Sequence, residues 1–144
     1  IYTQTFSTPM RRFEQYGQAF ITPSKLHEAG VKFCISNSES SFQTPHIRNL
    51  PYYAAKAASY GLPWDEALRS ITLSSAEILG VADQVGSLEI GKDATLFIAD
   101  GNILDIRSQV SRAFIQGRNV DMNDRHKMLD SKYRIKYQQQ GILK

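Results

Sequence analysis

Helical spacings alternate with short apolar runs over the first part of the chain. Aromatic residues at positions 13, 16 and 20 recur three and four apart, which is typical of one helical face. Thr22-Pro23-Ser24 then predicts a new helix over Lys25–Ala29, because proline fits a first helical turn, where its missing N–H has no partner to lose. The run Val31–Ile35 is almost wholly apolar, as in a strand covered on both faces of a parallel sheet. Residues 1–12 show no period and are interpreted as a loop.

Three more helices are predicted before residue 81. Tyr52–Tyr60 is rich in alanine, which allows close packing, and Asn49 stands at the expected cap position. Trp64–Thr72 carries two acidic residues in its first turn, where they favour the positive end of the helix dipole. The third helix would begin at Ser74 and end at Gly80. Ser74 and Glu77 have the spacing of a reciprocal capping box.

Beyond Gly80 the pattern becomes one of strands and turns. Gly and Asp-Gly punctuate short β-prone runs, which is the local signature of strands in a small sheet. The expected pieces are turns at Gly86-Ser87 and Gly91-Lys92-Asp93, an extended piece Leu88–Ile90, and strands Ala94–Ala99, Val110–Gln116 and Asn119–Asp121, the last after a Gly117-Arg118 turn. A final helix is predicted over Asp124–Tyr137, with Met128, Leu129 and Tyr133 on its apolar side.

Composition places the chain among globular domains. It has 144 residues, of which 42% are hydrophobic and 22% charged. No apolar run approaches the roughly 20 residues needed to cross a bilayer, so no membrane association is expected. The abrupt opening Ile1-Tyr2-Thr3, without a leader, suggests a piece of a longer or processed product, and the compartment stays open.

Positive charge is concentrated near the carboxyl terminus. From Arg107 onward nine Lys and Arg stand against three Asp, whereas eight basic and eleven acidic residues precede it. This tail lacks both the aromatic–glycine interleaving of an RNA-binding strand and the cysteine and histidine spacing of a zinc finger. A solvated amphipathic helix is therefore favoured, and no nucleic-acid partner is expected.

Few residues suggest chemistry by themselves. The lone Cys34 lies in an apolar run and is interpreted as a small buried hydrophobe. His27, His46 and His126 are spread over a helix, a loop and the tail, so structural or exposed roles are favoured over metal binding. Ser36–Ser41 is a polar stretch at the carboxyl end of a predicted strand, where α/β folds bind substrates and metals.

Three groups of sequence strings, in chain order, resemble the carboxyl-terminal third of the amidohydrolase superfamily, and within it the imidazolonepropionase-like branch. The likeness covers about Val31 to Tyr137. The strings are Arg48–Tyr52 with Tyr60–Pro63; Asp65–Leu68, Ile71-Thr72 and Ser75–Gly80; and Gly86–Glu89, Gly91–Ala94, Asp100-Gly101 and Gln116-Gly117-Arg118.

This resemblance implies an α/β fold: the last βα part of a metal-dependent-hydrolase TIM barrel, plus carboxyl-terminal strands of a small β-sandwich. Residues 1–79 would be barrel, with Val31–Ile35 as its last strand, residues 80–121 sandwich strands, and residues 122–144 the closing helix and tail. Eight βα units need about 250 residues. The remainder of the barrel, from the parent chain or a partner chain, is thus an expected partner, and a homo-oligomer is a further option.

The family chemistry implied by the resemblance is hydrolysis of a C–N bond in a cyclic amide or amidine by water activated on divalent, zinc-like metals. In that family a His-x-His pair, further histidines and an Asp at the end of the last strand hold the metals. No His-x-His occurs here, and Asn37 stands at the position of that Asp. A neutral amide is a poor metal ligand and cannot act as a base. Glu39 is the carboxylate nearest in sequence.

Ser36, Ser38 and Arg48 are candidates to line the pocket of a small-molecule substrate. Two main hypotheses follow. The parent is a hydrolase of non-peptide C–N bonds, with this segment inactive alone and holding no metal, or it is a binding protein that has lost catalysis on the same scaffold. The missing Asp favours the second. A self-standing interaction domain is the third.

Overall fold

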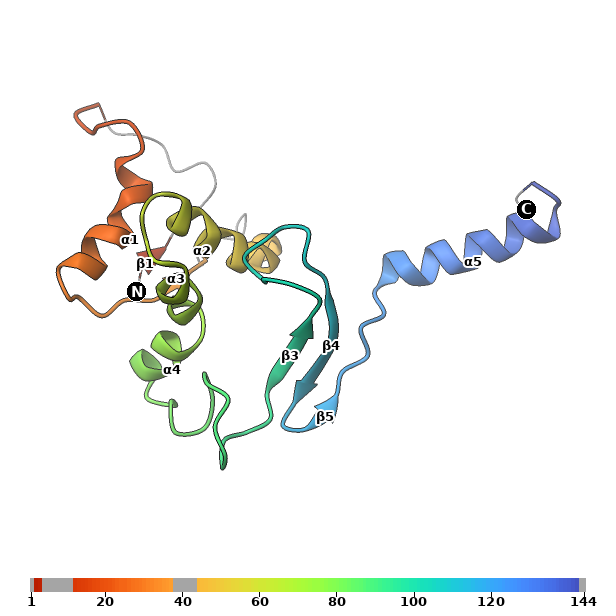
Figure 1. Ribbon diagram of the computed structural model, residues 1–144. Helices are drawn as coiled ribbons and strands as arrows, with labels where there is room; N and C mark the ends of the chain where they lie inside the picture. The colour runs from red at the N-terminus through yellow and green to blue at the C-terminus, as the bar shows by residue number, and fades with distance from the viewer. Residues whose placement is uncertain (1, 4–11, 38–43, 143–144) are drawn as a thin grey trace.

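The molecule consists of a helical half, a small sheet and a separate terminal helix (Figure 1). The computed structural model describes residues 2–3, 12–37 and 44–142. Its elements are β1 (Tyr2–Thr3), α1 (Gln18–Glu28), β2 (Ile35–Ser36), the 3-10 helix η1 (Thr44–Asn49), α2 (Leu50–Ser59), α3 (Trp64–Ser70), α4 (Leu73–Leu79), β3 (Leu96–Ala99), β4 (Val110–Ile115), β5 (Arg118–Asn119) and α5 (Arg125–Gln139).

One continuous helix, α1, replaces the short helix predicted over Lys25–Ala29 after an opening at Thr22-Pro23-Ser24. Pro23 lies inside α1 with its side chain fully buried. Burial of the ring offsets the one backbone hydrogen bond that proline cannot donate, so the helix continues through it. The spacing of the aromatic residues 13, 16 and 20 predicted one helical face, but Phe13 and Tyr16 precede α1 and are exposed.

The helices α2, α3 and α4 lie within two residues of their predicted bounds and build the core around β2. Ala54 and Ala57 of α2 are completely buried, which confirms the close packing expected of its alanines. The core cluster consists of Phe33, Ile35, Tyr53, Ala54, Ala57, Leu62, Ala67 and Leu104. Leu104, from the loop between β3 and β4, is its one member from beyond residue 80 within the described chain.

The predicted capping box of α4 is wrong. The helix begins at Leu73, and no side-chain hydrogen bond caps it. Glu77 instead forms ion pairs with Lys32 and Arg69. The attraction of two full positive charges outweighs that of one backbone N–H, so the carboxylate turns to the cations. At α2, Asn49 does occupy the cap position but makes no side-chain capping bond.

Two strands pair in parallel at the edge of the helical half. Tyr2 is opposite Ile35 and Thr3 is opposite Ser36. Parallel strands require a crossover connection, and α1 supplies it, which makes β1–α1–β2 a βαβ unit. The interpretation of residues 1–12 as loop is wrong at β1, and of the predicted strand Val31–Ile35 only its last residue belongs to β2.

The carboxyl-terminal half contains an antiparallel sheet with strand order β3-β4-β5. The hairpin between β4 and β5 turns at Gln116-Gly117, one residue earlier than predicted. These two residues have φ angles of 50° and 76°. Such a two-residue turn with positive φ matches the twist of its strands, and glycine meets this requirement without strain.

The second layer of the predicted β-sandwich, which would pack on β3, is not formed by the described residues. The predicted extended piece Leu88–Ile90 belongs to no strand. Phe97 and Ile98 of β3 are each 49% exposed. The two-layer sandwich, with β3 filling its core, therefore stays a prediction.

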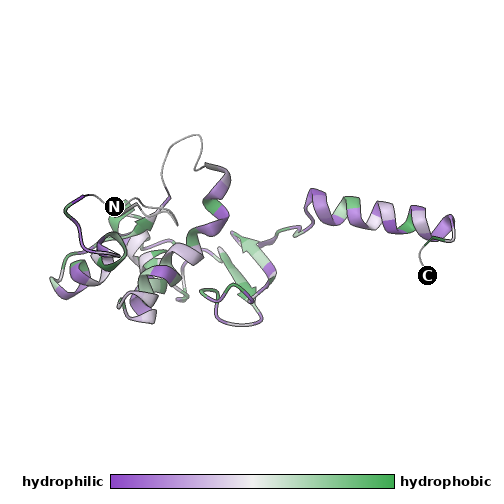
Figure 2. Cartoon of the chain, turned by 90° about the horizontal axis from the view of Figure 1, so that it is seen from above, coloured by the Kyte–Doolittle hydropathy of each residue, from purple (hydrophilic) through white to green (hydrophobic). Residues whose placement is uncertain are grey.

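The terminal helix α5 projects from the sheet on an extended segment (Figure 1). Its start agrees with the sequence, since the Asp124 side chain accepts a hydrogen bond from the Lys127 backbone N–H at 2.9 Å, as an N-cap does. None of its residues is buried. Figure 2 shows hydrophilic and hydrophobic residues alternating along it. Within the described residues, no helix has the length and apolar character to cross a membrane.

Candidate functional site

The predicted site at the carboxyl end of β2 brings two residues together. Ser36 and Asn37 are both half-buried there, and Ser36 Oγ donates a hydrogen bond to the backbone oxygen of Asn37 at 3.1 Å. Because β1 pairs with β2 in parallel, Thr3 lies beside Ser36, and the two strands end at the same edge. In parallel α/β folds this edge carries the functional groups.

Arg48, the remaining candidate among the described residues, is not joined to this pair. Arg48 is exposed on η1 and makes no hydrogen bond or ion pair with Ser36 or Asn37 in the described part of the chain. Ser38 and Glu39 lie outside the described residues. The strand end thus presents a hydroxyl and an amide, which can orient a ligand by hydrogen bonds but cannot take up a proton at neutral pH.

The described residues do not fit a divalent metal. Among them, no three His, Cys, Asp or Glu side chains are grouped closely enough to hold an ion. His27, His46 and His126 lie on α1, η1 and α5 respectively, and Cys34 is a free, buried thiol. Asn37 offers a single neutral oxygen as a ligand.

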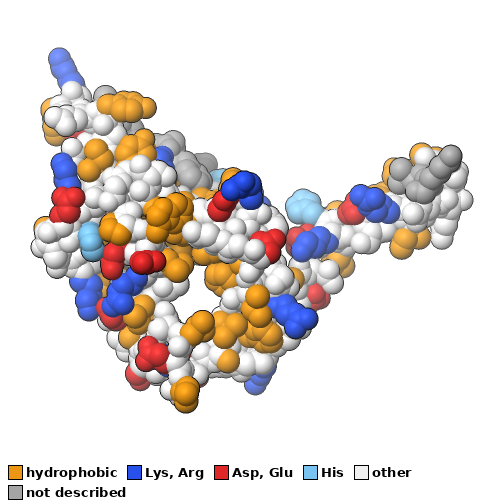
Figure 3. Space-filling model, viewed as in Figure 1, with side chains coloured by type: hydrophobic (Ala, Val, Ile, Leu, Met, Phe, Trp, Pro, Cys, Tyr) orange, Lys and Arg blue, Asp and Glu red, His pale blue; other side chains and the backbone are white. Residues whose placement is uncertain are grey.

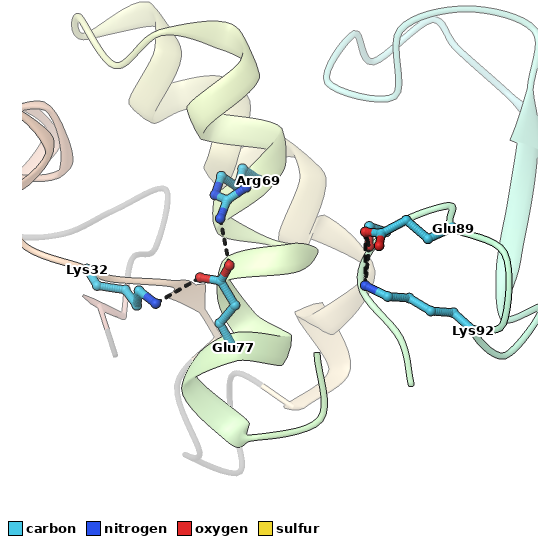
Figure 4. Close-up of polar contacts among 6 residues, drawn as sticks. Lys32, Arg69, Glu77, Glu89 and Lys92 are labelled. Atoms are coloured by element: carbon cyan, nitrogen blue, oxygen red, sulfur yellow. Dashed lines mark hydrogen bonds and ion pairs between the residues drawn. The ribbon is translucent and has the colours of Figure 1, made fainter. Parts of the chain in front are cut away.

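Sequence reasoning missed a charged cluster near the amino end of β2. Glu77 of α4 accepts a hydrogen bond from Arg69 Nη2 at 2.7 Å, and its other oxygen lies 3.0 Å from Lys32 Nζ (Figure 4). The hydrogen bond from Lys32, together with the charges of Lys32 and Arg69, lowers the pKa of Glu77 despite partial desolvation. The cluster ties the segment before β2 to α3 and α4.

These charges border a cavity of about 270 Å³, which His27 and Glu66 also line. His27 Nδ1 lies 3.7 Å from Glu66 Oε2. The cavity is separate from the strand-end site, because Lys32 precedes β2 whereas Asn37 follows it. Its acidic groups are paired with its basic ones, so the arrangement serves to hold helices together. The spacing of Ser74 and Glu77 in the sequence predicts a capping box and gives no sign of this pairing.

The Gly-rich stretch after α4 packs closely on that helix. An alanine Cβ at position 86 would lie 2.7 Å from Ala76 Cβ and 3.1 Å from Leu73 Cα, and Gly86 has a φ of 99°. Downstream, Lys92 Nζ pairs with Glu89 Oε1 at 3.1 Å (Figure 4). The predicted turns here are thus fixed by close approach and an ion pair, and carry no catalytic group.

Comparison with known sequences agrees with this scaffold. Residues 19–132 match the sequence model of the Amidohydrolase family. The chain belongs to the amidohydrolase family. The resemblance to its imidazolonepropionase-like branch is also confirmed, since the imidazolonepropionase of Brucella anthropi is 35% identical over 72 residues, or 50% of this chain and 18% of that protein.

Solved structures show the same α/β amidohydrolase fold. An amidohydrolase from Thermotoga maritima MSB8 matches with a TM-score of 0.65 and 31% identity, covering 78% of this chain and 29% of that one. A Xaa-Pro dipeptidase matches with a TM-score of 0.59 and 27% identity, covering 72% of this chain and 26% of that one. The chain therefore spans less than a third of each of these relatives.

Proposed function

We propose that this chain forms the carboxyl-terminal part of a (β/α)8 hydrolase barrel. Residues 1–79 complete the barrel, residues 80–121 contribute sandwich strands, and residues 122–144 form the terminal helix and tail. Family membership and the βαβ unit β1–α1–β2 support this assignment. Figure 3 shows hydrophobic side chains around an opening between the helical half and the sheet, as expected where another part of the barrel packs.

The parent protein, in this proposal, hydrolyses a non-peptide C–N bond in a cyclic amide or amidine. Support comes from the likeness to imidazolonepropionases. Ser36 and Ser38, with Arg48 from η1, would line the substrate pocket. A zinc-like metal, as in the family's other hydrolases, would need ligands beyond the described residues, since Asn37 and its neighbours do not fit one. This segment alone would be inactive.

The parallel register of β1 and β2 is the observation that carries the proposal. It places Thr3, Ser36 and Asn37 at one edge of a sheet whose further strands would come from the rest of the barrel. A parallel pair this short is not stable alone, because its outer ladder groups are left unpaired. The site therefore becomes complete only in the assembled parent.

Activity of the parent polypeptide tests the proposal. Purified with zinc, it is expected to open an imidazolone ring and to leave a Xaa-Pro dipeptide intact, followed by ultraviolet absorbance and by amino-acid release. Cleavage of the dipeptide instead would contradict the assignment to non-peptide bonds. Ser36→Ala should raise KM more than it lowers kcat, since Ser36 contributes binding and not a proton.

A non-catalytic binding protein on the same scaffold is a second proposal, favoured by Asn37 at the strand end. It expects the parent to bind a cyclic amide in calorimetry without turnover. Turnover by the unaltered parent would rule it out.

The chain alone is expected to bind no divalent metal tightly. Equilibrium dialysis against zinc, followed by metal analysis, measures this directly. Asn37→Asp is the matched variant, and it should not create a site by itself, because one carboxylate leaves the remaining ligands missing. Micromolar zinc binding by the unaltered chain would contradict the expectation.

A further inference from the structure

The turn that leads from α1 into β2 has few contacts of its own. Residues 28–32 are exposed, whereas residues 33–35 directly after them are buried. Gly30 ends the helix with a φ of 68°, and the backbone N–H of Val31 donates to the carbonyl oxygen of Leu26 at 2.9 Å. A Cβ built at residue 30 would meet no other described residue within 4 Å. Exposed backbone with few contacts opens easily, so the turn depends on the side-chain pairs around it.

Two such pairs flank the turn and cross the cavity of about 270 Å³. After the turn, Lys32 Nζ lies 3.0 Å from Glu77 Oε2 of α4 (Figure 4). Before the turn, His27 Nδ1 lies 3.7 Å from Glu66 Oε2 of α3. The first pair is charged at neutral pH, whereas the second is charged only when the imidazole is protonated.

Glu66 supplies the counter-charge for a protonated His27. Among the described residues no Lys or Arg forms an ion pair with Glu66, since Arg69, one helical turn along α3, is paired with Glu77. His27 also lies in the last turn of α1, where the negative end of the helix dipole attracts a cation. Both interactions strengthen when the imidazole becomes charged.

The other charged groups around His27 largely offset one another. Those that line the cavity or share the last turns of α1 are Lys32, Arg69, Glu77, Lys25 and Glu28. Glu77 pairs with both of the basic groups that line the cavity with it. Asp65 of α3 lines a different groove, and Lys56 of α2 lies over the ring of Phe20, toward the amino end of α1. The contact with Glu66 therefore dominates the response of His27 to a proton.

We propose that His27 and Glu66 form a pH-dependent latch between α1 and α3. With a neutral imidazole, the turn is held by the Lys32–Glu77 pair alone. With a protonated imidazole, the second ion pair forms and the turn is held at both ends. Because the turn leads directly into β2, the latch sets how firmly this strand is anchored at its start.

Amide hydrogen exchange of the full polypeptide that carries residues 1–144 tests the latch. Measurements at about pH 5.5 and about pH 7.5 lie on either side of the usual histidine pKa and above that of glutamate. The hydrogen-bonded amides of Ala29, Gly30 and Val31 should show protection factors about threefold higher at the lower pH, as expected of a partly exposed ion pair. Protection factors already correct for the intrinsic effect of pH on exchange, and those of β4 should not rise.

His27→Gln and Glu66→Gln should each abolish the rise in protection. Both side chains are 39% exposed, so neither substitution opens a hole in the core. His46→Gln, at a histidine of η1 outside the cavity, is the matched control and should keep the rise. His27→Lys should give the higher protection at both pH values, because lysine stays charged at both.

Four results would overturn the proposal. They are equal protection at the two pH values in the unaltered protein, a rise that persists in His27→Gln or Glu66→Gln, a rise that His46→Gln also removes, and a rise that survives in His27→Lys.

Discussion

The two halves of the chain share one family signature but differ in how many of their apolar residues are buried. The amino-terminal half, through α4, provides the whole core cluster except Leu104. Beyond residue 80, Leu104 is the one buried residue in the described part of the chain, although Phe97, Ile98 and Ile115 are as apolar as the core residues. The difference shows that apolar residues of the first half, joined by Leu104, cover one another, whereas most apolar residues of the second half are not covered by any part of the described chain.

Leu62→Ala should produce the largest loss of stability. Its side chain is 2% exposed in the helical core, and truncating a buried leucine costs about 4 kcal/mol of unfolding free energy. Ile90→Ala, at a fully exposed aliphatic side chain of the second half, should change it by less than about 0.5 kcal/mol. Urea unfolding followed by circular dichroism measures both. Equal losses would contradict the contrast between the halves.

Leu104→Ala should have a smaller effect, located at the junction of the halves. The loop around residue 104 can move partly into the space that the shorter side chain leaves, so the free energy of unfolding should fall by about 2.5 kcal/mol. Amide hydrogen exchange should become faster in β3 and β4, because Leu104 anchors their connecting loop to the helical core. Ile106→Ala, two residues along the same loop and exposed, is the control. Unchanged exchange in the sheet would show that the halves are independent.

Gly86→Ala should lower the free energy of unfolding by about 2 kcal/mol, because the new Cβ meets Ala76 and Leu73 and residue 86 has a positive φ. Gly91→Ala shares a positive φ, 97°, but has nothing within 4 Å. It should cost only the strain of the left-handed backbone, about 1 kcal/mol. Thermal unfolding of the two variants separates packing from strain. A larger loss at Gly91 would reverse this assignment.

The smallest effect concerns the pH dependence of the helical half. The folded state lowers the pKa of Glu77, so its ionised form stabilises the fold above its ordinary pKa of 4.5. That contribution is lost as the pH falls through the lowered pKa. Glu77→Gln should therefore flatten the decline of the urea midpoint between pH 5 and pH 3. Lys32→Met should raise the pKa of Glu77 in an NMR titration, whereas Lys25→Met should not.

The sequence predicted those helices whose bounds depend on the residues within and next to them. The bounds of α2, α3 and α4 followed from apolar spacing and helix ends, and Asp124 marked the start of α5. The predicted helix start around Pro23 is wrong, because the burial of the proline ring, a tertiary effect, outweighs the missing N–H. The strand β1 could not be predicted, since its two residues are ordered by pairing with β2 and not by their own pattern.

The candidate site divides in the same way. Ser36 and Asn37 follow one apolar run, so the sequence could place them at a strand end. The cluster around Glu77 unites three segments, and a spacing that also fits a capping box could not reveal it. The separation of Arg48 from Ser36 and Asn37 could not be predicted, because the sequence between β2 and η1 has no periodic pattern.

The free edge of β3 has a consequence for producing this protein. β3 pairs only with β4 among the described strands, so its other edge leaves backbone donors and acceptors open beside the half-exposed Phe97 and Ile98. Such an edge is a template for any extended chain it meets. During synthesis or refolding, segments of neighbouring molecules compete for it. Yield from dilute refolding should therefore fall steeply as the protein concentration rises, and inclusion bodies should be enriched in intermolecular β-structure.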